Sequence, residues 1–319
     1  MPHTTTRRAV VAAAASAFAM GVLPQFARAV DKPPIRVLIW DEQQPAQKQA
    51  YGDHFLGNTI ADHLTQNPAL SVRSVVMPPK DQADKDDPNL SEESLAQTDV
   101  LIWWGHLRHR QVKWEVGDRI VDRVKANKLA LICLHSSQGS TPFIKAMNAR
   151  TIDDALKTLP EEQRKTAKLN LITPSYKAIK KDTPLTPSTE KTTNPDGTVT
   201  LTIHLPHCVF PSWREAGEPT HVTTLLPDHP IAAGLPQKWD VTHDEMYDEP
   251  FHVPAPDVVL FEHRWDRGEH HRGGMLWNLG AGKVFYYQPG HETYAVYKEP
   301  LPLKVVENAA VWMGGQVAK

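Results

Sequence analysis

Three apolar segments of this chain end in the same way, with a short turn followed by a histidine. They are brief and almost wholly apolar, and they span 99–104, 129–134 and 283–287. Such runs are typical of strands buried on both faces of a helix-covered parallel sheet. His106, His135 and His291 follow them directly. Because ligands of open α/β sheets bind beyond the carboxyl ends of parallel strands, we expect these three imidazoles to face one crevice.

The rest of the chain alternates between strand-like and helix-like segments. Further strands are expected at 35–40, 70–76, 257–261 and 274–277, and helices at 51–66, 112–124, 141–149 and 302–313. This alternation predicts an α/β fold, a mostly parallel sheet with helices on both faces. With 40% apolar residues, the chain can bury a sizeable core. Residues 150–206 break the pattern, and we interpret them as an insertion in which Asp196 and Gly197 turn a hairpin.

Residues 1–29 have the features of an export signal. Arg7 and Arg8 precede an Ala-rich apolar run, and Ala27-Arg28-Ala29 resembles a cleavage site. The paired arginines favour the twin-arginine route, although an ordinary secretory signal or an uncleaved anchor would share these features. We therefore expect an exported protein, periplasmic or extracellular, with its domain spanning 33–315.

The composition restricts the partners of the protein. The formal net charge is -2 and no basic stripe is present, so we expect no nucleic acid. No segment after the signal is long and apolar enough to cross a membrane, and two cysteines, Cys133 and Cys208, do not establish a disulfide. The sequence does not decide whether the protein forms a homo-oligomer.

Each candidate site residue also has a structural explanation. His106 and His109 have a spacing that can bind zinc, but either could simply belong to the first turn of a helix. Ser136 lies at a strand-to-helix turn, where His291 and Glu292 could supply a base and its orienting carboxylate. The G-x-S-x-G pattern is absent, so Ser136 fits a polar lining residue better than a nucleophile.

A short acidic segment offers further ligands. Residues 243–251 hold Glu245, Tyr247 and Glu249, and could form a solvated loop, but their aromatic residues argue against full exposure. A carboxylate from this segment would complete a mixed His/carboxylate metal site or serve as a general base. The charged run 266–272, in contrast, is expected to be an exposed turn.

Six motifs together resemble the ThuA-like (trehalose utilisation) family. They occur in the family's order: WWGHLRH at 103–109, LICLHSS at 131–137, WREA at 213–216, DHPIAAGL at 228–235, DEMYDEPF at 244–251 and PGHETYAVY at 289–297. The resemblance implies a class I glutamine amidotransferase-like, flavodoxin-like fold and a disaccharide or keto-sugar substrate. The resemblance also implies that the protein works alongside dehydrogenases that make keto-sugars.

The chain departs from the patterns of the family and its superfamily in three places. The insertion at 150–206 precedes Cys208 and Trp213, and Ser137-Gln138 replaces the family's Gly-His. His135-Ser136 stands where glutamine amidotransferases carry the elbow cysteine, so glutaminase activity is not expected.

Our leading hypothesis is a carbohydrate-processing enzyme that uses a divalent metal, zinc first among the candidates, and no nucleotide cofactor. The expected metal ligands are His106, His135, Glu249 and His291. His291 or Glu245 would move a proton, with Glu292 orienting His291, in either metal-assisted hydrolysis or proton abstraction beside a carbonyl. The expected substrate contacts are Trp104, His109, Arg214, Tyr247 and Tyr294. The alternatives are a non-catalytic carbohydrate-binding protein and a serine hydrolase that uses Ser136.

Overall fold

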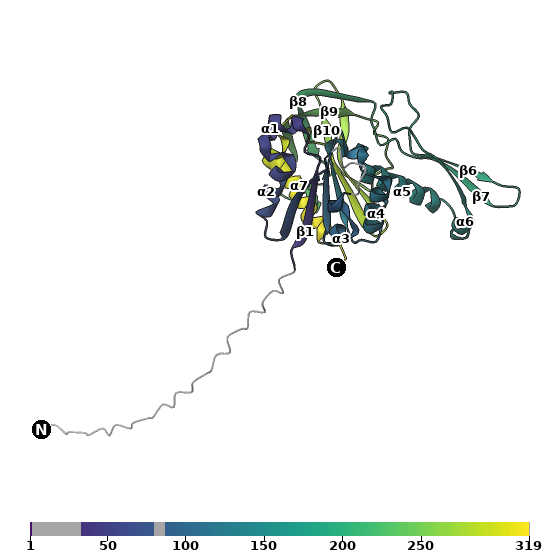
Figure 1. The fold of residues 1–319 in the computed structure, drawn as a ribbon, viewed down its shortest axis with the longest axis horizontal. Coiled ribbons are helices and arrows are strands. Elements are labelled where there is room, and N and C mark those ends of the chain that lie inside the picture. Colours follow the sequence, from purple (N-terminus) through teal and green to yellow (C-terminus); the bar gives the residue numbers. More distant parts are fainter. Residues whose placement is uncertain (2–32, 80–86, 319) are drawn as a thin grey trace. The chain divides into compact units, whose positions relative to one another are not determined.

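The computed structural model describes residues 1, 33–79 and 87–318. The export signal expected over 1–29 therefore lies, apart from Met1, outside the described residues. Residues 34–319 form one compact unit, which includes the insertion (Figure 1). Among the described residues, no helix has both the length and the apolar character that crossing a bilayer requires.

A nine-stranded sheet forms the centre of this unit, and five of its strands are parallel neighbours. Their order is β2-β1-β3-β4-β12, formed by β1 (Ile35–Asp41), β2 (Leu70–Val76), β3 (Val100–Trp104), β4 (Ala130–Leu134) and β12 (Gly282–Tyr287). The 2-1-3-4-5 order is that of flavodoxin-like folds. Its β3, β4 and β12 are adjacent, so the turns that follow them meet at one edge of the sheet.

Four antiparallel strands extend the sheet beyond β12. They are β11 (His270–Leu279), β10 (Val258–Arg264), β8 (Ser212–Thr224) and β9 (Lys238–Asp248). Two expectations are corrected here. Most of the acidic segment 243–251 lies in β9, and the run 266–272 is only in part an exposed turn, because β11 begins at His270 and His271 is fully buried.

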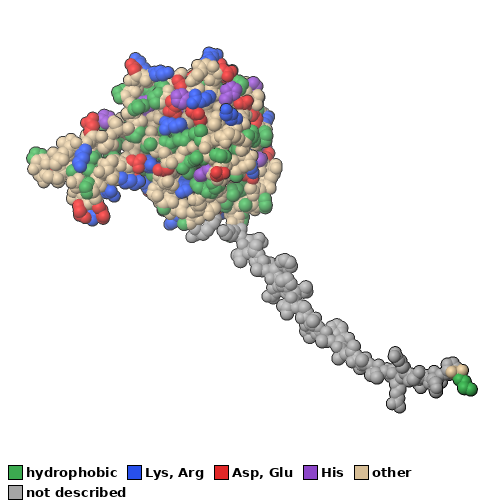
Figure 2. Space-filling model, turned by 180° about the vertical axis from the view of Figure 1, so that it is seen from behind, with side chains coloured by type: hydrophobic (Ala, Val, Ile, Leu, Met, Phe, Trp, Pro, Cys, Tyr) green, Lys and Arg blue, Asp and Glu red, His purple; other side chains and the backbone are tan. Residues whose placement is uncertain are grey.

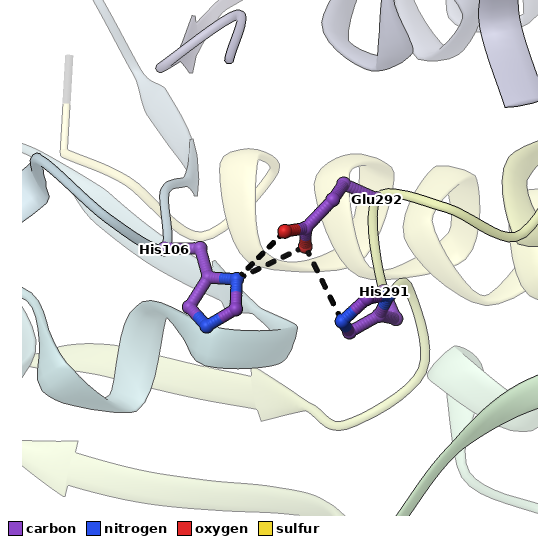
Figure 3. A group of neighbouring side chains, drawn as sticks. All are labelled: His106, His291 and Glu292. Carbon is purple, nitrogen blue, oxygen red and sulfur yellow. Dashed lines mark hydrogen bonds and ion pairs between the residues drawn. The ribbon is translucent and has the colours of Figure 1, made fainter. Parts of the chain in front are cut away.

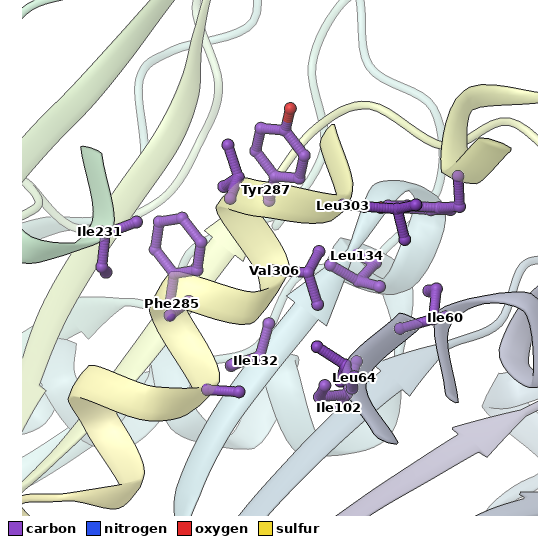
Figure 4. Packing of buried hydrophobic residues seen from close by; sticks show 14 of the residues in the cluster. Ile60, Leu64, Ile102, Ile132, Leu134, Ile231, Phe285, Tyr287, Leu303 and Val306 are labelled. Atoms are coloured by element: carbon purple, nitrogen blue, oxygen red, sulfur yellow. The ribbon is translucent and has the colours of Figure 1, made fainter. Parts of the chain in front are cut away.

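Helices cover both faces of the parallel strands, because successive strand residues point to opposite faces. Val37 and Ile39 of β1 pack in the core beneath α2 (Leu56–Thr65) and α7 (Pro300–Gly314), which Figure 4 shows at close range. Leu38 and Trp40 pack in a second core, which holds residues of α3 (Glu92–Ala96), α4 (Trp114–Lys125) and α5 (Thr141–Lys157). A further short helix, α1 (Lys48–Tyr51), precedes α2.

The insertion projects from the domain as a small sheet with its own packing. It contains α6 (Glu161–Thr166), β5 (Lys168–Ile172), β6 (Ser188–Thr193) and β7 (Val199–His204), in the order β5-β7-β6 (Figure 1). The expected hairpin is confirmed, since β6 and β7 pair antiparallel around Gly197 at φ 81°. Leu201 and Ile203 of β7 are buried with Leu159 beyond α5, which anchors the arm to the domain.

The surface mixes charges of both signs. On the face shown in Figure 2, basic and acidic side chains alternate closely, and no wide patch of a single sign appears there.

Candidate functional site

The three strand-end histidines lie together at the carboxyl edge of the sheet. The ring centroids of His106 and His135 are 6.4 Å apart, those of His106 and His291 5.9 Å, and those of His135 and His291 5.4 Å. Each ring comes from the turn that follows a different one of the neighbouring strands β3, β4 and β12. The three imidazoles therefore converge, as expected from the sequence, although only His106 lines the cavity described below, and His135 and His291 are buried behind it.

His135 occupies a tight turn between β4 and the short 3₁₀ helix His135–Gly139. Its backbone has φ 52°, a conformation that non-glycine residues seldom adopt and that is frequently found at functional sites. Nδ1 of its ring lies 2.8 Å from the carbonyl oxygen of Gln288. A carbonyl oxygen only accepts, so Nδ1 carries a proton, and Nε2 is the nitrogen that faces the other side chains of the site.

Glu292 contacts His106 more closely than it contacts His291. Its carboxylate oxygens lie 2.9 and 3.1 Å from Nδ1 of His106, whereas Nε2 of His291 is 3.8 Å away (Figure 3). The expectation that Glu292 orients His291 is thus corrected in favour of His106. With Nδ1 donating to the carboxylate, the neutral ring of His106 leaves the lone pair of Nε2 free.

A second histidine–carboxylate pair is formed across the sheet. Glu245 of β9 places Oε2 3.2 Å from Nε2 of His135, and the hydroxyl of Tyr247 lies 3.1 Å from the same nitrogen. All three side chains are nearly inaccessible to solvent. The antiparallel extension of the sheet is what brings Glu245 to histidines that come from the parallel half.

Asp244 holds the backbone of the third strand end in place. Its buried carboxylate accepts hydrogen bonds from the N–H groups of Gly290 and His291, both at 3.2 Å, and from the amide of Gln288. Burial raises the pKa of Asp244 to about 6, although these bonds oppose the shift. Asp244 thereby fixes the position of His291 without contacting the ring.

Burial and the nearby charges shift the pKa values of the site in different directions. Burial disfavours the charged form of His135, but the hydrogen bond and charge of Glu245 outweigh it and raise the pKa of His135. Burial together with the charge of His135 lowers the pKa of His291 to about 4. Burial alone would raise the pKa of Glu292, but the hydrogen bond and charge of His106 lower it to about 2.

Two groups of side chains bring potential metal-ligating atoms within 4.8 Å of one another. One is His135, Glu245 and His291, and the other is His106, His291 and Glu292. Both groups contain His291, and each provides two imidazoles and one carboxylate. This donor set suits zinc, whose catalytic sites keep a fourth position open.

Glu249, which we expected among the metal ligands, lies elsewhere. Its Oε1 is 2.8 Å from Nε of Arg272 and 3.7 Å from Nδ1 of buried His271, and it belongs to neither ligand group. Burial would raise the pKa of Glu249, but Arg272 and His271 lower it to about 2. The carboxylate is therefore engaged in a structural ion pair.

A cavity of about 340 Å³ opens beside the histidines. Its walls include His106, Ser136, Glu245 and Tyr247 from the site, together with His109, Arg110, Gln138, Trp213 and Ala178. Ala178 comes from the insertion, so the insertion contributes to the cavity rim. The Trp213 side chain is 53% exposed and has no aromatic partner among the described residues.

Of the remaining residues expected to contact the substrate, some lie at the cavity and others do not. His109 and Tyr247 line the cavity, and the Tyr294 ring lies 5.4 Å from that of His291. Trp104 is fully buried and donates to the carbonyl of Gly290, so it does not line the cavity. Arg214 is held by Glu218 and Glu269.

Ser136 has a tyrosine as its partner rather than a base. Its Oγ lies 3.3 Å from the hydroxyl of Tyr247, and among the described residues no hydrogen bond joins it to His291. The contact that a serine nucleophile needs is therefore absent from this arrangement.

Three residues of the site were not identified from the sequence. Trp213 and Arg110 line the cavity, and Glu215 lies 3.7 Å from Nε2 of His291. Trp213 and Glu215 belong to the WREA motif, where only Arg214 was singled out. In an extended strand neighbouring residues point to opposite sides, so a strand prediction for this motif would have separated Trp213 from Arg214.

Comparisons with known proteins agree with this architecture. The family model described as ThuA, trehalose utilisation, matches residues 36–313. A ThuA-like protein of Parabacteroides merdae ATCC 43184 aligns with a TM-score of 0.54 and 16% identity, covering 90% of this chain and 92% of that one. One of Bacteroides uniformis ATCC 8492 aligns at 0.50 and 13%, covering 89% and 92%. No curated protein matches the sequence. The structural likeness confirms the expected α/β fold, which this chain shares with these ThuA-like proteins.

Proposed function

Because the chain belongs to the ThuA, or trehalose utilisation, family, we propose that its cavity is the active site of an enzyme that acts on a disaccharide or keto-sugar. Family membership indicates a function in carbohydrate utilisation, and the proposal adds chemistry at a defined place. One observation carries it: three imidazoles and two carboxylates meet at a sheet edge beside a cavity of about 340 Å³. A pocket with convergent titratable groups is where catalysis is expected.

His106 is the proton acceptor in this proposal, and Glu292 positions it. Nδ1 of His106 is 2.9 Å from the Glu292 carboxylate, which fixes the ring and stabilises the imidazolium that forms when Nε2 takes a proton. His106 lines the cavity and its side chain is 33% exposed, so a substrate can reach it. Such a base can take the proton of a C–H group beside a sugar carbonyl when the enolate oxygen that forms is stabilised in the site.

Proton abstraction makes bond cleavage or rearrangement accessible. The C–H bond breaks, its electron pair forms an enolate with the carbonyl, and the proton moves to Nε2 of His106. Return of the proton to the former carbonyl carbon, together with transfer of a proton from the neighbouring hydroxyl to the enolate oxygen, isomerises the sugar. Where a glycosidic oxygen is attached to the next carbon, that C–O bond breaks, and the departing oxygen takes a proton, which completes an elimination.

A divalent cation, zinc by its donor preference, would be held by His135, Glu245 and His291 and would supply polarisation of the carbonyl oxygen. The chain fits such an ion at His135, whose Nδ1 is tied to the carbonyl of Gln288, the usual arrangement of a metal-bound histidine. At His291 the ring is held differently, because Nδ1 accepts the backbone N–H of Thr293 at 3.3 Å and lies 2.8 Å from its hydroxyl.

The test measures exchange of hydrogen at carbon. A keto-disaccharide is incubated with the protein in D₂O, and its proton spectrum is followed by NMR. We expect deuterium to replace one hydrogen beside the carbonyl, and His106→Ala to slow this by roughly a hundredfold or more. Cleavage that retains the hydrogen beside the carbonyl in the product would favour direct hydrolysis, and binding without any reaction would favour a carbohydrate-binding protein.

A further inference from the structure

One wall of the cavity carries a cation that pairs with no carboxylate among the described residues. Arg110 lines the cavity, and among those residues its only hydrogen bond is from Nε to the carbonyl of Gly139, at 3.3 Å. Many other arginines of the domain are paired with carboxylates: Arg36 with Asp99, Arg119 with Glu92, Arg150 with Asp257, Arg214 with Glu218 and Arg272 with Glu249. Arg73, Arg108 and Arg164 also have no carboxylate partner among the described residues, but they do not line this cavity.

The fold seats this guanidinium in a defined position. A Cβ atom on Gly139 would come within 3.0 Å of Nη2 of Arg110 and within 3.2 Å of Nε2 of His109. The two side chains thus occupy the space that glycine leaves, next to each other on the cavity wall. His109 is 2% exposed, and its Nε2, on the Gly139 side, makes no hydrogen bond with the described residues. The wall thus presents a cation beside an imidazole nitrogen that no other described group engages.

The carboxylates near this wall do not oppose an incoming anion strongly. Glu245 is paired with His135 at 3.2 Å and Glu292 with His106 at 2.9 Å. Each negative charge thus has an imidazole beside it, whereas no carboxylate among the described residues pairs with Arg110. A planar guanidinium binds carboxylate or phosphate oxygens through paired N–H groups, which adds affinity and fixes orientation.

We propose that Arg110, with His109, binds an anionic group of the sugar substrate, so that the enzyme acts on an acidic rather than a neutral sugar. This inference rests on the proposed function, because it concerns the same cavity. A sugar carboxylate and a sugar phosphate offer the same oxygen chemistry to the guanidinium. The anionic group would lie against Arg110 while the reacting carbon faces His106.

Calorimetric titration at constant ionic strength tests the proposal with four probes: glucose, trehalose, glucuronate and glucose 6-phosphate. We expect one of the acidic sugars to bind at least tenfold more tightly than glucose, and the preferred one identifies carboxylate or phosphate. Arg110→Gln should remove this preference and leave the affinity for glucose unchanged. Arg110→Lys should retain part of it, because the charge remains without the paired N–H groups.

Two further variants make the result specific. Gly139→Ala should weaken the binding of the acidic sugar, because the added methyl group displaces the guanidinium of Arg110. Arg264→Gln removes an exposed arginine that is paired with Glu262 outside the cavity, and it should leave the affinity for every probe unchanged. Equal affinity of wild-type protein for neutral and acidic sugars would overturn the proposal and leave the proposed function standing. Failure of all four sugars to bind would count against both.

Discussion

The carboxylate of Glu292 lies closer to the ring of His106 than to that of His291, its neighbour in the chain. Nδ1 of His106 lies 2.9 Å from its carboxylate, and Nε2 of His291 lies 3.8 Å from it. This relationship separates the histidines by role: His106 with its carboxylate suits proton transfer, and His291 belongs with His135 and Glu245. The predictions below follow from that division.

Replacing Glu292 should affect turnover rather than binding. In Glu292→Gln the ring of His106 loses the charge that stabilises its protonated form, so we expect kcat to fall by roughly a hundredfold with a small change in affinity. Glu215→Gln is the matched control, because Glu215 lies 3.7 Å from His291 and its side chain is 53% exposed. Steady-state kinetics and calorimetry measure both effects. Similar losses in the two variants would contradict a specific role for Glu292.

Glu249 should matter for stability and not for metal. Its pKa is lowered from 4.5 to about 2, so the ion pair with Arg272 contributes fully above about pH 4.5 and is lost as the pH falls through about 2. Glu249→Gln should therefore reduce the free energy of unfolding at pH 7 by up to about 3 kcal/mol. The difference from wild type should shrink as the pH falls. Urea unfolding at several pH values measures this difference in the free energy of unfolding. If Glu249→Gln lost bound metal without being destabilised, Glu249 would be a metal ligand after all.

The metal content of the protein should depend on the buried pair of His135 and Glu245, together with His291. We expect the purified wild-type protein to hold about one zinc ion, in line with the donor set. His135→Ala and Glu245→Gln should each lower the content strongly, whereas Glu249→Gln should not. Mass spectrometry of the metal gives the stoichiometry, with circular dichroism to confirm folding. Less than a tenth of an equivalent of any transition metal in gently purified wild-type protein would remove the metal from the account.

Trp213 should contribute binding energy to the substrate. Its half-exposed indole lines the cavity and has no aromatic partner in the described part of the chain, so a sugar ring can pack on its face. Trp213→Ala should weaken sugar binding by about tenfold and leave kcat largely intact. Trp114→Ala is the control, because Trp114 is also exposed but lines a different cavity. An equal response of both variants would show that the effect is not local.

Ser136 should be dispensable for the reaction. Its Oγ contacts the hydroxyl of Tyr247 and no histidine among the described residues, so it lacks a base. We expect Ser136→Ala to retain most of the activity, and a fluorophosphonate probe to leave Ser136 unlabelled in wild-type protein. Labelling at this serine, together with loss of activity in the variant, would establish a serine hydrolase instead.

The sequence predicts the parallel half of the molecule well, because that half is local in its signals. The strands that end before His106, His135 and His291 are continuous apolar runs, and parallel strands share one functional edge. Their convergence follows from these two facts alone.

The other half depends on contacts between distant segments. Glu245 reaches His135 because β9 belongs to the antiparallel extension of the sheet. His271 is buried because it packs against Phe251 and Tyr286, and the charged residues beside it in the sequence give no sign of this burial. Glu292 and His106 are far apart in the chain, so nothing in either motif indicates that they pair. Such pairings are set by tertiary structure and leave no periodic signal.

Exchange of carbon-bound hydrogen tests the central claim most directly. The wild-type protein, the His106→Ala variant and the Glu292→Gln variant are each incubated with a keto-disaccharide in D₂O, and NMR records deuterium uptake beside the carbonyl. The account predicts uptake with wild-type protein and a large loss of rate in both variants, while the sugar still binds. Uptake that persists unchanged in His106→Ala would contradict it.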